Sequence, residues 1–249
     1  MKKLAILTVV ALFMAGTAQA ASIGVNFFNY KSGGGYNGGL GVLPDDTAGV
    51  ESQTNWNNFN FGGGATNGRS VWNETDSWWE HDSSETYIDS DGNDTSLTVS
   101  LSSGHDIYGT KDVDSGSGDG KLMSGVNGFP NKSFTVDNVP YATYDLIVYL
   151  LDRDNNISDT SGATATDGTT TYYVDPSTYF GTSHVQMSST TSGSPDAGTY
   201  VRFNGLGGST TIDVNHDGMA GFQIVPEPAT MALLGFGGIG LVLRRRRRA

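Results

Sequence analysis

Four tryptophans that lie close together in the sequence are the residues best suited to binding a ligand. Trp56, Trp72, Trp78 and Trp79 fall within 24 residues, and asparagine, aspartate and glutamate residues are interleaved with them. Indole rings stack on the C–H faces of sugars, while neighbouring amides and carboxylates pair with sugar hydroxyls. The cluster therefore indicates a carbohydrate site. The alternative is that these rings fill the core or cover its edge, because large aromatic side chains are mostly buried.

A second group of residues has the spacing of calcium ligands. Asp213, Asn215 and Asp217 fit the opening D-x-N-x-D of a calcium-binding loop. The twelfth position of such a loop needs a bidentate acid, and here that position is Ile224. The flanking residues have strand patterns, so the favoured interpretation is a β-hairpin turn capped by Asp and Asn. We expect no cofactor other than weakly bound Ca²⁺.

Signals for an enzyme are poor. His81 and His105 each precede an aspartate, but neighbouring residues of a strand point to opposite faces and do not form a natural relay. His184 stands alone, and the known nucleophile, zinc and phosphate-loop motifs are absent. We predict a non-enzymatic protein. The alternative is a polysaccharide-active hydrolase, whose paired acids need not be close in sequence.

The elements that position these residues have the period-two alternation of β-strands. Turn clusters separate them, among them 89–94 and 152–156, where acidic residues are again interpreted as turn caps rather than calcium ligands. The pattern predicts an all-β fold, a single β-sandwich of jelly-roll type over residues 21–225. The expected strands are Ser22–Phe28, Ser96–Leu101, Ser133–Val136, Tyr144–Leu151, Thr170–Val174, Thr199–Phe203, Thr210–Val214 and Gly221–Val225.

The same body is strongly acidic. Residues 21–225 contain seven basic and 25 acidic residues, a net charge of −18, because the other seven basic residues lie at the two ends of the chain. Such a body repels phosphate backbones, so we expect no nucleic-acid partner. The chain has no cysteine, which excludes disulfides and thiol-bound metals.

The N-terminal residues have the pattern of a secretory signal peptide. Two lysines precede an apolar run over residues 4–15, and Ala18 and Ala20 stand at the positions that a signal peptidase reads. We expect a signal helix within residues 1–20 that is cut after Ala20. An uncut membrane anchor is the alternative, but the apolar run is short for a bilayer.

The C-terminal residues 226–249 have three successive parts. Pro226, Glu227 and Pro228 form a stiff break that ends the preceding strand. An uncharged run over 229–243 then predicts a transmembrane helix of about 22 Å, short of the hydrocarbon thickness. Five arginines follow and hold that end in the cytoplasm, so the body lies on the other side of the membrane. They are Arg244, Arg245, Arg246, Arg247 and Arg248.

This tail resembles the PEP-CTERM sorting signal of Gram-negative and related bacteria. The resemblance implies that the tail is recognised by an exosortase, a membrane-embedded cysteine transpeptidase that cleaves near Pro-Glu-Pro. It also implies export, transient anchoring in the inner membrane, a final place at the cell surface or in the extracellular matrix, and association with exopolysaccharide and biofilm. The alternative is an ordinary tail anchor that happens to contain Pro-Glu-Pro.

Short segments of the body resemble surface proteins that carry the same tail. The segments are Ile23–Phe27, Ala48–Val50, Asn55–Asn58 and Gly221–Val225, the last of which runs directly into Pro-Glu-Pro. The resemblance implies a galactose-binding-like jelly roll. Three functions stay open: a surface or matrix protein that binds carbohydrate, a purely structural or adhesive protein, and a polysaccharide-active hydrolase.

Overall fold

The computed structural model describes most of the body of the chain. The described residues are 21–28, 41–60, 69–73, 78–82, 84–102, 107–109, 116–127, 132–151, 162–176, 183–216 and 218–227. The expected signal peptide, the segment 229–243 and the arginine cluster lie outside them. No helix among the described residues is both long and apolar enough to span a membrane. Residues 21–225 form one compact unit.

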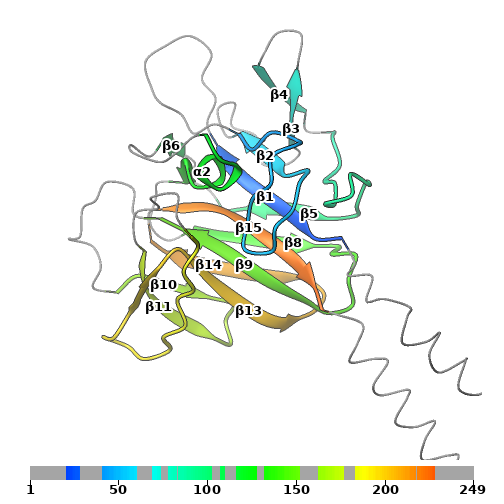
Figure 1. Ribbon diagram of the computed structural model, residues 1–249. Coiled ribbons are helices and arrows are strands. Elements are labelled where there is room, and N and C mark those ends of the chain that lie inside the picture. The colour runs from blue at the N-terminus through cyan, green and yellow to red at the C-terminus, as the bar shows by residue number, and fades with distance from the viewer. Residues whose placement is uncertain are drawn as a thin grey trace, which may run out of the picture. The chain divides into compact units, whose positions relative to one another are not determined.

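Two β-sheets make up this unit (Figure 1). The described strands of the first sheet follow the order β13-β9-β15-β1-β2-β3-β4, with β7 and β6 attached beside β15, and those of the second follow β12-β11-β10-β14-β8-β5. The strands of the first sheet are β1 (Ile23–Phe28), β2 (Asn57–Asn60), β3 (Arg69–Asn73), β4 (Trp78–Asp82), β6 (Ile107–Gly109), β7 (Gly125–Asn127), β9 (Tyr144–Leu150), β13 (Tyr200–Leu206) and β15 (Met219–Pro226). Those of the second are β5 (Thr98–Leu101), β8 (Lys132–Asp137), β10 (Thr164–Thr166), β11 (Thr171–Pro176), β12 (Asp196–Gly198) and β14 (Thr210–Asn215).

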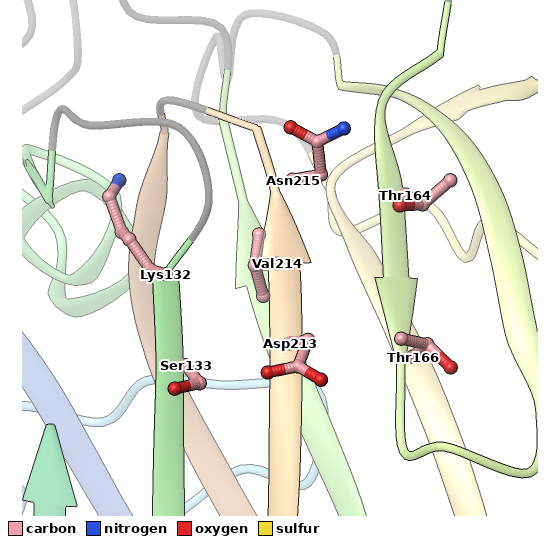
Figure 2. Close-up of a pocket in the computed structure, with 7 residues that line it drawn as sticks. All are labelled: Lys132, Ser133, Thr164, Thr166, Asp213, Val214 and Asn215. Atoms are coloured by element: carbon pink, nitrogen blue, oxygen red, sulfur yellow. The ribbon is translucent and has the colours of Figure 1, made fainter. Parts of the chain in front are cut away.

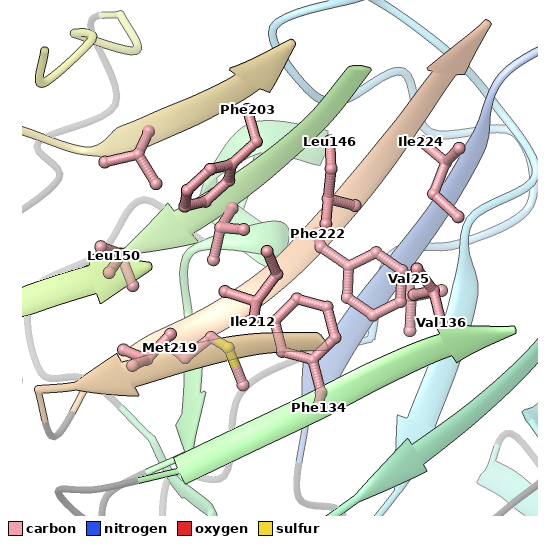
Figure 3. Packing of buried hydrophobic residues seen from close by; sticks show 14 of the residues in the cluster. Val25, Phe134, Val136, Leu146, Leu150, Phe203, Ile212, Met219, Phe222 and Ile224 are labelled. Carbon is pink, nitrogen blue, oxygen red and sulfur yellow. The ribbon is translucent and has the colours of Figure 1, made fainter. Parts of the chain in front are cut away.

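The main core lies between the sheets. Phe134 and Val136 of β8, and Ile212 and Val214 of β14, are buried and alternate with polar residues on the outer face, as period-two patterning requires. Phe134 of β8 stacks on Phe222 of β15, with ring centroids 4.8 Å apart and planes 11° apart. Figure 3 shows these rings among Ile212, Leu146 and Val136. The prediction of an all-β sandwich is therefore confirmed.

A second apolar cluster covers the outer face of the first sheet. Residues 41–56, which we call the cover segment, lie there together with helix α2 (Gly118–Leu122). This cover explains why β9 and β15 are buried on both faces and why 144–151 is a nearly continuous apolar run. The cluster consists of Val42, Ala48, Trp56, Leu122, Met123, Ile147, Tyr149, Leu151, Ala220 and Val225.

All eight expected strands are present, but the hairpin predicted around residues 213–218 is wrong. Strand β14 belongs to the second sheet and β15 to the first, so the connection crosses between the sheets. Strand β14 alternates and needs one buried face, whereas β15 is buried throughout and lies between β9 and β1. Two adjacent strands with such different burial cannot pair as one half-exposed hairpin.

The turn predicted at residues 89–94 is confirmed. The Oδ1 atom of Asp89 accepts hydrogen bonds from the backbone N–H groups of Asp91 and Asn93, each at 2.9 Å. Gly92 has a φ of +83°, which glycine adopts without strain. Asp89 is therefore occupied in capping its own turn. The other acidic turn, 152–156, lies outside the described residues.

Candidate functional site

The structure places the four tryptophans in two different parts of the fold. Trp56 is only 4% exposed and lies in the cover cluster. Its Nε1–H lies 3.3 Å from the carbonyl oxygens of both Ala48 and Gln53, and its ring packs edge-on against Tyr149 at 6.1 Å. Trp56 therefore fills a core and presents no ring face to a sugar.

The other three tryptophans lie on one antiparallel pair of strands. Strand β4 is the last strand in the order of the first sheet, and β3 is its neighbour. In their register Trp72 is opposite Trp79, and Asn73 is opposite Trp78. The fold thus brings these three residues together on the backbone of a single strand pair. Their role as a carbohydrate platform stays a prediction.

Two of the three predicted calcium ligands line a groove on the outer face of the second sheet. Asp213 and Asn215 are exposed residues two positions apart on β14, so they share one face of the sheet. In the register Asp213 lies between Ser133 of β8 and Thr166 of β10. Figure 2 shows these three side chains side by side, with Asn215 opposite Thr164. The groove has a volume of about 220 Å³ and is lined by Lys132, Ser133, Thr164, Thr166, Asp213, Val214 and Asn215.

Hydrogen bonding within the groove leaves several oxygens available. The Thr166 hydroxyl donates to the Thr170 carbonyl at 2.9 Å and accepts from Gly168 N at 3.1 Å. By contrast, within the described part of the chain the Asp213 carboxylate and the hydroxyls of Ser133 and Thr164 make no side-chain hydrogen bond. These groups are therefore free to pair with a polar ligand.

The groove offers little to a metal ion. Asp213 is the only carboxylate among its lining residues. Among the residues that the structure describes, no three His, Asp or Glu side chains gather closely enough to hold a metal. Asp217, the third predicted ligand, lies outside the described residues, so weak calcium binding stays a prediction.

A histidine–aspartate pair that the sequence did not indicate lies beneath the cover segment. The Nε2 atom of His184 is 3.0 Å from Oδ1 of Asp119, on helix α2, and the same oxygen accepts the backbone N–H of Gly49 at 2.7 Å. Burial alone would raise the pKa of Asp119, but the hydrogen bonds from His184 and Gly49 outweigh it, so the pKa is lowered. The ionised carboxylate thus joins three segments that are far apart in sequence.

A buried polar network lies beside this pair. The Tyr149 hydroxyl donates to Oε1 of Gln223 at 2.9 Å and accepts the backbone N–H of Val50 at 2.8 Å. Burial raises the pKa of Tyr149, which therefore stays protonated as a donor. Gln223 Nε2 in turn donates to Oε1 of Gln53 at 2.6 Å. The side chain of His184 is 7% exposed and that of Asp119 is 35% exposed. Through Gly49, Val50 and Gln53, the pair and the network fasten the cover segment.

The last strand leads from this network into the tail. Strand β15 ends at Pro226, and Glu227 beyond it is exposed, which confirms that Pro226 closes the sheet. Residues 225–248 match the PEP-CTERM protein-sorting motif.

The PEP-CTERM match decides the route of the protein. The motif identifies an exported protein that is anchored in the membrane in transit and is processed by an exosortase. The match covers the tail and leaves the body outside it. No curated protein and no solved structure matches the chain, so the galactose-binding-like resemblance of the body stays a prediction.

Proposed function

We propose that this protein is a non-enzymatic component of the cell surface or extracellular matrix whose body binds carbohydrate, such as exopolysaccharide of a biofilm. The groove across β8, β14 and β10 carries the proposal. It sets the carboxylate of Asp213, which makes no side-chain hydrogen bond to the described residues, between hydroxyl-bearing residues of the two neighbouring strands. Carboxylates and hydroxyls arranged in this way pair with the adjacent hydroxyls of a sugar.

The size of the groove and the net charge of the body limit the class of ligand that the groove can bind. Pockets for drug-sized ligands have about 300–1,000 Å³, whereas this groove has about 220 Å³. It therefore suits one or two units of a polymer that continues across the open sheet face. Because the body has a net charge of −18, a neutral polysaccharide is favoured over an anionic one.

We infer a jelly roll from the order of the strands. Eight strands form the two four-stranded halves of this arrangement, and they are numbered 1 to 8 in chain order for the comparison. They are β1, β8, β9, β10, β11, β13, β14 and β15. The first sheet then contains the order 1-8-3-6 and the second contains 2-7-4-5. Consecutive strands that cross repeatedly between two sheets in this order are typical of the double Greek key of a jelly roll. The parallel pairing of β2 with β1 is an addition at one side of this arrangement.

Binding of the full-length protein to an array of neutral and anionic polysaccharides tests the proposal. We expect Asp213→Ala to reduce binding at least tenfold, since it removes the central acceptor of the groove. Thr211→Ala is the matched control, because Thr211 lies on the same face of β14 but outside the groove and bonds to Thr135. Equal binding by the two variants would contradict a site in the groove.

The same array, together with an assay for newly formed reducing ends, separates the other candidates. Loss of binding in Trp78→Ala or Trp79→Ala, with Asp213→Ala unaffected, would place the site on β4 instead. Binding of no polysaccharide would favour a purely structural or adhesive protein. Release of new reducing ends from a polysaccharide would favour a hydrolase.

A further inference from the structure

Strand β15 leads directly into the sorting motif, and its burial limits where the chain can be cut. All eight residues of Met219–Pro226 are buried, whereas Glu227 is exposed. The match to the motif begins at residue 225. The first two matched residues, Val225 and Pro226, therefore belong both to the sorting motif and to the folded sheet.

The end of β15 is held from both sides. The strand lies between β9 and β1 rather than at an edge of the sheet. Ile224 is opposite Ile23 in the antiparallel register with β1 and belongs to the main core. Val225 is 3% exposed and belongs to the cover cluster. Removing Val225 would open the cover cluster, and removing Ile224 as well would open the main core and leave Ile23 of β1 without its partner.

The start of the body is held at the same end of the sheet. The Ile23–Ile224 pair lies at one end of the register of β1 with β15. Just before it, the Ala21 carbonyl accepts a hydrogen bond from the Tyr141 hydroxyl, and the Ser22 carbonyl accepts the N–H of Ser90 at 2.8 Å. The described residues at the two ends of the body, 21–28 and 218–226, are thus both held in the fold.

A processing enzyme must hold the residues around the scissile bond as a chain free of other partners. Up to Ile224, β15 has a neighbouring strand on each side and few unpaired backbone groups to offer, and Val225 and Pro226 beyond it are buried. Releasing β15 would require unfolding the centre of the sandwich, which is among its least accessible openings. Bonds within 219–226 are therefore protected once the body has folded.

We propose that the exosortase cuts this chain on the folded body and C-terminal to Pro226, at the Glu227–Pro228 bond or beyond. This inference rests on the processing route given by the sorting motif. In the step, the peptide C–N bond breaks and the acyl carbon bonds to an acceptor, either water or a surface amine or hydroxyl. The released tail nitrogen takes the proton that the acceptor gives up. The product keeps the whole of β15.

The test is the mass of the mature protein. The full-length chain is produced together with an exosortase that is shown to process another substrate, and the product is analysed by intact mass and C-terminal peptide sequencing. We expect a product that ends at Glu227 or a later residue. A product that ends at Pro226 or earlier would overturn the inference while leaving the processing route intact. A chain that stays uncut would overturn the route, and the inference with it.

A linker variant provides a second measurement. Inserting Gly-Ser-Gly between Val225 and Pro226 keeps Pro-Glu-Pro whole but moves it away from the sheet. We expect the unprocessed form to disappear faster than in the natural chain, with the cut at the same position relative to Pro-Glu-Pro. An unchanged rate would show that the folded strand does not restrict the enzyme, and would overturn the inference.

Discussion

The Nε2 atom of His184 lies 3.0 Å from Oδ1 of Asp119, although 65 positions separate the two residues. Asp119 stands on the short helix α2 and also accepts the N–H of Gly49 in the cover segment. One carboxylate therefore fixes two segments over the outer face of the first sheet.

We predict that Asp119→Asn lowers stability at neutral pH and that its effect fades in acid. The folded-state pKa of Asp119 is below its ordinary value of 3.8. Its ionised form thus stabilises the fold above pH 3.8, and this contribution is lost as the pH falls through the lowered value. Urea unfolding of the full-length protein at pH 7, 5 and 3 measures the difference. The exposed Asp45→Asn is the control, and a difference that persists undiminished at pH 3 would contradict the role given to ionised Asp119.

We predict that Gly49→Ala destabilises the protein by about 3 kcal/mol, through strain and overpacking together. Gly49 has a φ of +95°, and a Cβ atom there would lie 2.8 Å from Cζ2 of Trp56 and 3.0 Å from the Tyr149 hydroxyl. Gly168→Ala is the matched control, because its φ is +83° but no atom lies within 4 Å. Its cost should be about 1 kcal/mol, from the backbone alone. Urea unfolding measures both variants. An equal loss of unfolding free energy in the two would show that the packing around Gly49 is loose.

We predict that Arg202→Lys costs about 1 kcal/mol because lysine lacks the guanidinium fork. The Nε and Nη2 atoms of Arg202 donate to Oδ2 of Asp145 at 3.0 and 2.8 Å, and Nη1 donates to Glu51 at 2.9 Å. The side chain of Asp145 is 14% exposed and that of Glu51 is 36% exposed. A double-mutant cycle should therefore give a larger coupling energy for Arg202 with Asp145 than with Glu51. The reverse order would contradict this assignment.

We predict that Trp56→Ala destabilises the fold by about 3–5 kcal/mol, as expected for a large aromatic removed from a core. Trp56→Phe should recover part of this loss, because a ring would still pack on Tyr149. Thermal unfolding followed by far-UV circular dichroism measures both variants. Carbohydrate binding by the folded Trp56→Phe protein should equal that of the natural chain. A loss of binding without a loss of folding would show that Trp56 takes part in the ligand site.

Several residues that resembled a family pattern have physical roles that only the structure explains. Gly49 is required by its positive φ and by the ring of Trp56 against it. Asn57 donates to the Gly24 carbonyl at 2.9 Å, and Asn58 accepts the N–H of Val42 at 2.9 Å. These asparagines join β1, β2 and the cover segment. Their pattern in the sequence indicated a relationship, but not that they close the outer face of a sheet.

The sequence by itself determined the features that depend on local order. Period-two alternation located eight strands, because burial of one sheet face places apolar residues at every second position. Charge and apolar run length at the two ends indicated export and the sorting tail, which depend on consecutive residues. The continuous apolar run 144–151 predicted a central strand, and β9 lies between β13 and β15.

Only the tertiary structure decided which strands are neighbours and which side chains meet. Alternation shows that a strand has two faces, but it does not specify its partner, so β14 and β15 were wrongly expected to pair. Short strands such as β10 and β12, three residues each, have too few positions to show a period. The Asp213 groove and the His184–Asp119 pair join residues from distant segments, and such contacts follow from the packing of whole sheets rather than from spacing along the chain.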